Sequence, residues 1–512
     1  MKYVMGADIG TQSVKVQLYD QDMNVIAKSS IEHYVDTPKP AWATQNANNW
    51  WKLVCENIHN VLDKSAVNPE DIVGFGCCGH MHGATPVRED GTVIDENVQL
   101  YSDKRAGDIA DALAERLTDE EYALSANAPI SAWHGLKVKW IKDNLPEVYK
   151  EAYKFLTPKD FIVFKLTGVP SIDPSEASGT FCMDCNTNEW SDTLIAEVGI
   201  DKEKLPTIHK AYEIVGKISE KAAKETGLST NTAVIAGGGD MLAMLYASGM
   251  YKLGTVVDNT GTGGSFQAYT EKPVMDKRIM NLRHVLEGWV PFGGIDTAGG
   301  AYRWIRDNLA KDETKIARAN GRDEYDYLNE IASATPAGAE GLYFFPYLMG
   351  ERTMGTPDSR GCFIGLSLDK TIGHIVRAVL EGETFDFKRV LDIFEASGAK
   401  VDVIWHCAGG AKGDLWNQIK ADIYNKPIYT LEADQGGVLG VALMAAVATG
   451  LQEDLEKSAE AITKIKKVYQ PNPANREIYD AMYKEYCRLH DALMPEFKNM
   501  ADIQREFGKQ QL

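Results

Sequence analysis

Two aspartates, Asp8 and Asp240, stand next to glycine-containing turns. Asp8 ends an apolar run and comes two residues before Gly10 and Thr11, whose backbone N–H groups and hydroxyl suit a phosphate. A carboxylate beside a triphosphate is repelled unless a divalent cation lies between them, so Asp8 is predicted to hold Mg²⁺, directly or through water. A local turn or cap is the alternative, and Asp8 alone does not separate the two.

Asp240 follows three glycines, Gly237–Gly239, at the point where an apolar run ends and a helix is expected to begin. Aspartate is a favoured N-cap residue, so helix capping is one interpretation. Consecutive glycines also let a ligand approach the backbone closely. In phosphoryl transfer an aspartate accepts the proton of the attacking alcohol, and such a base contributes on the order of 10²–10⁴-fold in rate. We therefore predict that Asp240 is a catalytic base.

A similar turn recurs in the second half of the chain. The run Val256–Tyr269, VVDNTGTGGSFQAY, echoes the run around Asp8, and each run is expected to form a β-hairpin. One such turn is weak evidence for a phosphate site. Two of them predict a duplicated fold with a nucleotide between its halves, and the second turn would contribute Gly261, Thr262 and Gly263.

Two histidines flank a methionine in the segment Gly79–Gly83, GHMHG. A His-x-His pair is a fragment of a metal site, but the spacing supplies no third ligand. A small polyol explains the pattern better, because His82 offers a directed donor or acceptor and Met81 a soft apolar wall. A buried core histidine is the alternative. Asp103 is a further carboxylate for hydroxyl groups, or else half of a surface ion pair with Arg105.

A third turn of small residues, Gly409, Gly410 and Ala411, lies between an apolar strand and a predicted helix. Small residues there let a flat purine lie against the backbone. Glycine at such a turn often serves packing alone, so this signal is weak by itself. Together the turns predict phosphate, purine and polyol contacts along one chain.

Length and composition exclude several classes of protein. A chain of 512 residues exceeds what one core organises, and a net charge of −19 argues against nucleic-acid and anionic-membrane partners. The apolar helix predicted near 438–449 is too short for a bilayer, which needs about 20 residues. Asp8 interrupts the N-terminal apolar run, so no secretory signal is predicted. We expect a soluble, cytoplasmic protein.

Strands alternate with helices twice along the chain, which predicts an α/β protein of two similar lobes. We expect the lobes at 1–246 and 247–512, packed closely and joined by a hinge, because no low-complexity linker separates them. The eight cysteines show no disulfide framework. The pairs Cys77/Cys78 and Cys182/Cys185 are predicted to be structural thiols rather than redox or metal groups.

These motifs, in this order, resemble carbohydrate kinases of the FGGY family, and the xylulokinases among them, over essentially the whole chain. The matching segments are DIGT at Asp8, MHGAT at Met81, GGGD ending at Asp240, GTGG at Gly261, PYLMGERT at Pro346, GCFIGL at Gly361 with the following HIVRAVLE, and AGGAKGDLWNQIKADI at Ala408.

The resemblance implies two ribonuclease-H-like lobes of the actin/hexokinase/Hsp70 ATPase type, with a catalytic cleft between them. It implies phosphorylation of a sugar hydroxyl by ATP, of D-xylulose first and of another ketose or polyol second. By motif match Asp240 is the base, and the sugar contacts are Met81, His82, Asp103 and Asp240. The implied ATP and Mg²⁺ contacts are Asp8, Gly10, Thr11, Gly261, Thr262, Gly263, Gly409, Gly410 and Ala411. The implied partners are a sugar and ATP/ADP, with no nucleic acid and no membrane, and a homodimer is left open.

The sequence departs from the family pattern on the sugar-facing side. His80 stands where Gln is typical, Tyr101-Ser102-Asp103 where Trp-Asn-Asp is typical, and His134 where a small hydroxyl residue or proline is usual. These changes concern the choice of substrate more than the reaction. A sugar or nucleotide sensor that has lost catalysis is an alternative, against which the retained Asp8 and Asp240 argue. A chaperone- or actin-like ATPase is another, and it leaves the Met81–His82 motif unexplained.

Overall fold

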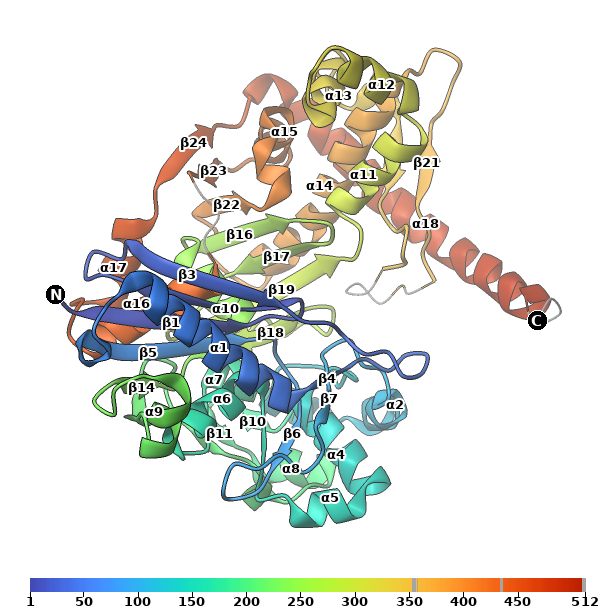
Figure 1. Cartoon of the computed structure of the whole chain (residues 1–512). Coiled ribbons are helices and arrows are strands. Elements are labelled where there is room, and N and C mark those ends of the chain that lie inside the picture. Colours follow the sequence, from blue (N-terminus) through green and yellow to red (C-terminus); the bar gives the residue numbers. More distant parts are fainter. Residues whose placement is uncertain (352–355, 357, 433–435, 509–512) are drawn as a thin grey trace.

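A computed structural model of the chain describes residues 1–351, 356, 358–432 and 436–508. It places two mixed sheets one above the other, with helices between and around them (Figure 1). The first half of the chain builds the lower sheet and the second half builds the upper one. The expectation of an α/β protein with two similar lobes is therefore confirmed.

Both sheets run through the same order of strands. The first sheet contains β1 (Tyr3–Ile9), β2 (Ser13–Tyr19), β3 (Val25–Glu32), β5 (Ile72–Gly79), β13 (Ile214–Lys217), β14 (Ala233–Ile235) and β15 (Gly238–Gly239). The second contains β16 (Thr255–Thr260), β17 (Gly264–Ala268), β18 (Met280–Arg283), β19 (Trp289–Ile295), β22 (Val403–Cys407), β23 (Ile428–Leu431) and β24 (Ile465–Tyr469).

In the first sheet the order β3-β2-β1-β5-β14 joins an antiparallel meander to the parallel strands β1, β5 and β14. In the second sheet β19-β17-β16-β22-β23 repeats this pattern, with β16, β22 and β23 parallel. The two predicted hairpins are thus β1–β2 and β16–β17. Each hairpin supplies the first two strands of its sheet along the chain, so the Gly-Thr turns occupy equivalent places in the two lobes.

Two helices cross between the sheets: α10 (Asp240–Ala247) and α16 (Gly437–Ala448). Although α16 lies between β23 and β24 of the second sheet along the chain, it packs on β1 and β5 of the first. A Cβ atom on Gly440 would lie 2.1 Å from the carbonyl oxygen of Ala243, so glycine permits the crossing. The apolar character of α16 thus comes from burial on all sides. In the described ranges, no helix is long and apolar enough to cross a membrane.

Other helices cover the outer faces of the sheets. On the first sheet these are α1 (Ala47–Ser65) and α6 (Pro158–Thr167), and on the second α14 (Ile372–Ala396) and α15 (Asp414–Tyr424). Trp50 on α1 and Val379 on α14 are fully buried and belong to the core between helix and sheet.

The remaining elements connect these layers. The helices are α2 (Gly107–Arg116), α3 (Asp119–Ser125), α4 (His134–Asn144), α5 (Pro146–Glu151), α7 (Pro174–Ser178), α8 (Asp192–Val198), α9 (Glu220–Thr226), α11 (Gly299–Asn308), α12 (Lys311–Ala319), α13 (Glu324–Ser333), α17 (Leu455–Ile462) and α18 (Arg476–Gly508). The short strands are β4 (Thr44–Asn46), β6 (Thr85–Val87), β7 (Asn97–Gln99), β8 (Lys154–Leu156), β9 (Ser171–Ile172), β10 (Met183–Asp184), β11 (Glu189–Trp190), β12 (Thr207–Ile208), β20 (Tyr343–Phe345) and β21 (Cys362–Ile364).

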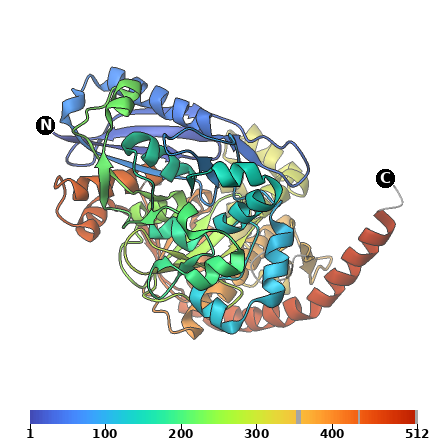
Figure 2. The same ribbon diagram turned by 90° about the horizontal axis from the view of Figure 1, so that it is seen from below.

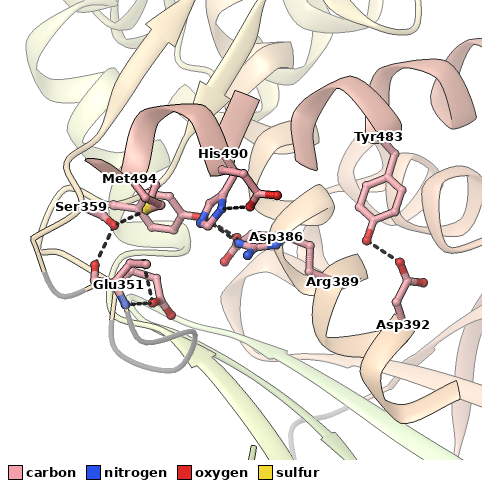
Figure 3. Close-up of polar contacts among 11 residues, drawn as sticks. Glu351, Ser359, Asp386, Arg389, Asp392, Tyr483, His490 and Met494 are labelled. Carbon is pink, nitrogen blue, oxygen red and sulfur yellow. Dashed lines mark hydrogen bonds and ion pairs between the residues drawn. The ribbon is translucent and has the colours of Figure 1, made fainter. Parts of the chain in front are cut away.

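The C-terminal helix α18 lies along the second lobe and extends beyond it (Figures 1 and 2). Tyr483 of α18 donates to Asp392 of α14 at 2.5 Å, and Ser359 donates to the sulfur of Met494 at 3.1 Å (Figure 3). The helix α18 therefore connects α14 with the segment around Ser359, between β20 and β21. The last residues of the PYLMGERT motif, Arg352 and Thr353, lie outside the described residues.

The cysteines of the described part of the chain are all free thiols. Cys77 and Cys78 lie on β5, and burial raises the pKa of both well above the usual range of a thiol. Burial likewise raises the pKa of Cys182 to about 12 and that of Cys185 to about 11. Protonated buried thiols are poor nucleophiles and ligands, which agrees with the predicted structural role.

Candidate active site

Asp8 and Asp240 line one cavity between the two lobes. Its volume is about 1150 Å³, and its lining also includes Lys15, Asn259 and Ser265. Asp8 comes from β1, whereas Asn259 and Ser265 come from the second hairpin. The cavity therefore brings both hairpins and the start of α10 to one place, as the duplicated turns predict.

Asp240 is the first residue of α10, and Gly239 is the N-cap. Its Oδ1 atom accepts a hydrogen bond from the backbone N–H of Met241 at 2.7 Å. Burial, and after it the negative charge of Asp8, raise the pKa of Asp240 to about 7. A general base is most effective when its pKa lies near the working pH, so this environment suits proton abstraction.

One oxygen of Asp8 is available to a ligand. Its Oδ1 atom is buried and has no hydrogen-bond partner among the described residues, while Oδ2 lies 3.5 Å from the ammonium of Lys15. Burial raises the pKa of Asp8, although Lys15 opposes the shift. In the described part of the chain, no group of three or more His, Cys, Asp or Glu side chains is arranged to hold a metal ion by itself. Asp8 therefore fits Mg²⁺ that takes its other ligands from water and phosphate.

Hydrogen bonds with residues outside the first Gly-Thr turn (Gly10–Thr11) hold its backbone in place. The N–H of Gly10 donates to Ser13 at 3.1 Å, and the carbonyl of Gly10 lies 2.6 Å from Nε2 of His33. Gln45 donates to the carbonyl of Thr11 at 2.7 Å. His33 and Gln45 could not be predicted to contact this turn, because each reaches it from a distant part of the chain.

The second Gly-Thr turn (Gly261–Gly263) and the turn Gly409–Ala411 lie at a common cavity of about 840 Å³. Its lining includes Gly261, Thr262, Gly409, Gly410, Tyr302, Arg303, Tyr325, Asn329, Lys412, Gly413 and Trp416. Gly263 and Ala411 adjoin it. The carbonyl of Gly263 accepts from the N–H of Gly261 at 2.9 Å, and that of Ala411 accepts from Asn417 at 2.9 Å.

Gly410 lies close to the floor of this second cavity. A Cβ atom on Gly410 would lie 2.9 Å from Cγ2 of Thr260 and 3.0 Å from Nε2 of His406. The opposite wall contains Tyr302, which donates to Asn329 at 2.9 Å. These two residues were missed because neither α11 nor α13 carries a recognisable nucleotide motif.

The Gly79–Gly83 segment lies beside the glycine turn that precedes Asp240. A Cβ atom on Gly239 would lie 2.7 Å from the sulfur of Met81, so Met81 packs directly against the residue before Asp240. His82 has a left-handed backbone with φ of 69°, and its ring packs edge-on against Trp133 at 5.1 Å between centroids. The structure thus places Met81 next to the residue before Asp240, whereas the His82 ring packs on Trp133.

Histidines near this loop have unpaired ring nitrogens. Both nitrogens of His80 and of His134 are buried without a hydrogen-bond partner in the described part of the chain. Burial lowers the pKa of each of these imidazoles to about 3, and it also lowers the pKa of His82 well below its usual value. The rings are therefore neutral, and each offers one donor and one acceptor to a hydroxyl-bearing ligand.

Asp103 is paired with Arg105, but the pair is buried rather than on the surface. The exposed side-chain fractions are 0% for Asp103 and 7% for Arg105. Both carboxylate oxygens of Asp103 accept from the guanidinium of Arg105, at 2.9 and 2.8 Å. The alternative of a surface pair is wrong because Trp42 covers the guanidinium at 3.7 Å.

Comparison with known families explains this arrangement. The model "FGGY family of carbohydrate kinases, N-terminal domain" matches residues 3–246, and the corresponding C-terminal domain matches residues 258–449. The chain belongs to the FGGY family of carbohydrate kinases. It is therefore an enzyme that transfers a phosphoryl group to a carbohydrate, built on two lobes of the actin/hexokinase type.

Individual relatives of the family match nearly the full chain. A xylulose kinase of Bacillus subtilis (strain 168) is 30% identical over 494 residues, 96% of this chain and 97% of the relative. A gluconokinase of the same organism is 28% identical and covers 98% of each chain. The crystal structure of a xylulose kinase from Rhodospirillum rubrum superposes with a TM-score of 0.90 at 26% identity, over 97% of this chain and 100% of that one.

Proposed function

We propose that this enzyme phosphorylates D-xylulose at its terminal hydroxyl with ATP, giving D-xylulose 5-phosphate and ADP. The observation that carries the proposal is the close packing of Met81 on Gly239, the residue before Asp240, together with the place of Asp240 in the lining of the interlobe cavity. The xylulose kinases among its relatives support the substrate, and another ketose or polyol is the alternative.

In the proposed reaction Asp240 accepts the proton of the sugar hydroxyl. The freed oxygen attacks the γ-phosphorus of ATP, and the bond from that phosphorus to the bridging oxygen breaks, releasing ADP. Mg²⁺ held near Asp8 would offset the negative charge of the phosphates. In this mechanism Asp240 accepts the proton, and the neighbouring Asp8 would hold the cation.

The charges near His82 favour an uncharged sugar over a sugar acid such as gluconate. Lys137 donates to the carbonyl of His82 at 2.9 Å, and Arg105 is engaged by Asp103. Burial also lowers the pKa of Lys137 to about 7. These two cations are already committed to protein partners, whereas the neutral rings of His80 and His134 suit hydroxyl groups.

An ADP-release assay over D-xylulose, other ketoses, polyols and gluconate tests the proposal. We expect Asp240→Ala to lower kcat by at least about 10²-fold while ATP affinity is retained. His82→Ala should mainly raise the KM of the sugar.

An unchanged kcat in Asp240→Ala would overturn the role of Asp240 as the base. Gluconate as the preferred substrate would overturn the choice of D-xylulose. ATP turnover without any sugar would favour an ATPase, and binding without turnover a sensor.

Three further proposals concern the setting of the reaction. ATP binds with its purine near Gly410 and its phosphates between the two Gly-Thr turns. The lobes divide near residues 246 and 247, and the enzyme works in the cytoplasm. A homodimer stays a prediction, which sedimentation of the purified protein would test.

A further inference from the structure

The short helix α7 contacts both the glycine turn Gly237–Gly239, which precedes Asp240, and the Gly79–Gly83 segment (the sugar-binding loop). Asp173 caps it, and its Oδ2 atom accepts from the N–H of Ser175 at 2.8 Å. Ser175 and Glu176 are polar yet fully buried. Burying polar groups costs free energy unless they form hydrogen bonds, so their bonding partners indicate what they do.

Ser175 holds the residue before the proposed base. Its Oγ atom accepts a hydrogen bond from the backbone N–H of Gly239 at 2.9 Å. Gly239 is the N-cap of α10, and Asp240 is the first residue of that helix. The position of the Asp240 backbone is therefore fixed by a side chain of α7.

A buried lysine reinforces the same connection. The ammonium of Lys159 donates to the carbonyl of Ala236 at 3.2 Å and pairs with Asp173 at 3.0 Å. Ala236 begins the glycine turn, whereas Asp173 caps α7. Lys159 also pairs with Asp160, so its charge is balanced inside the protein. Both ends of the glycine turn are thereby tied to the start of α7.

Glu176 holds the sugar-binding loop from the other side of α7. Its Oε2 atom accepts from the backbone N–H of His82 at 3.2 Å, while Lys137 donates to the carbonyl of His82 at 2.9 Å. His82 has a φ of 69°, a left-handed conformation that is strained for a non-glycine residue. The two bonds offset this strain and fix the direction of the imidazole.

We propose that α7 sets the geometry between base and sugar, with Ser175 positioning Asp240 and Glu176 positioning His82. The inference rests on the roles proposed above for Asp240 and His82. Ser175 and Glu176 act through those two residues and do not take part in the chemistry. Neighbouring residues of one helical turn thus control different kinetic constants: Ser175 acts on kcat and Glu176 acts on the KM of the sugar.

Replacing Ser175 tests the first half of the proposal. Ser175→Ala removes one oxygen, and we expect kcat to fall roughly tenfold to a hundredfold, because small displacements of a catalytic group are costly. The KM of D-xylulose should stay within about twofold of the parent value. Ser229→Ala is the matched control, since Ser229 is a buried serine that donates to Glu70 and lines neither of the two cavities. It should leave both constants unchanged.

Two replacements of Glu176 test the second half. Glu176→Leu removes the acceptor for the His82 N–H, and we expect the KM of D-xylulose to rise roughly tenfold or more, with a smaller change in kcat. Glu176→Gln keeps an acceptor oxygen and should restore a KM close to that of the parent. A general loss of packing would not be rescued by glutamine in this way. If Glu176→Leu does not fold, Glu176→Ala takes its place in the same measurement, because it removes the same acceptor.

Asp240→Ala, measured in parallel, separates this inference from the function on which it rests. Loss of kcat in Asp240→Ala with unchanged constants in Ser175→Ala and Glu176→Leu would overturn the role of α7 and leave the kinase mechanism intact. An active Asp240→Ala variant would overturn the mechanism itself. A drop in thermal midpoint without a split between kcat and KM would assign α7 a merely structural role.

Discussion

Replacing Asp240 with asparagine should lower activity and raise stability at the same time. The side chain is largely buried, and burial together with the charge of Asp8 raises its pKa from 3.8 to about 7. The folded protein therefore binds a proton more tightly than the unfolded chain does. Stability falls as the pH rises from about 4 to about 7, because the folded protein must then hold an ionised carboxylate.

The size of the effect follows from the raised pKa. The difference between 3.8 and about 7 corresponds to about 4 kcal/mol. Water in the cleft screens part of this cost, so we expect Asp240→Asn to stabilise the protein by about 2 kcal/mol at pH 8. At pH 5 the gain should be smaller, since the parent carboxyl is then largely protonated. The same change should lower kcat by at least about 10²-fold.

Urea unfolding at pH 5 and pH 8, combined with the ADP-release assay, measures both effects. Asp103→Asn is the matched control, because both oxygens of Asp103 accept from Arg105. That variant leaves a guanidinium without its partner and should destabilise the protein. Equal stability of Asp240→Asn and the parent at pH 8 would refute the argument that the cleft opposes ionisation of Asp240. An unaltered kcat would refute its role as the base.

Three other predictions follow from the same geometry. Asp8→Asn removes a charge that raises the pKa of Asp240, so the acid limb of the kcat/KM profile should move to lower pH; a limb that stays in place would show that Asp8 does not act on Asp240. Gly410→Ala brings a methyl group against Thr260 and His406, and the KM of ATP should rise roughly tenfold while the KM of the sugar is unchanged. Gly440→Val places a side chain against the carbonyl of Ala243, which should destabilise the protein by about 1–3 kcal/mol in urea unfolding. Gly107→Val is the control, because a Cβ atom on Gly107 meets open space, and it should cause no comparable loss.

The sequence alone determined the features that are local in the chain. The turn after Asp8, the glycine turn before Asp240 and the turn at Gly409 could be predicted, because Gly-rich turns between apolar runs are set by neighbouring residues. The family follows from the order of the same motifs. The repeated hairpin predicted the duplicated fold, because each copy forms the first two strands of its own sheet and the two sheets are equivalent.

The tertiary structure decided everything that depends on burial and on contacts between distant segments. Helix α16 gave an apolar pattern in the sequence, but only the fold places it on the first sheet beneath the second. Asp103 and Arg105 are close in sequence, yet Trp42 makes their pair a buried one. Ser175 and Glu176 carry no periodic signal and acquire their importance from Gly239 and His82, which reach them from other parts of the chain. A pattern of residue types records what a segment can do, whereas solvent exclusion, which decides the cost of a charge or an unmade hydrogen bond, exists only once the chain has folded.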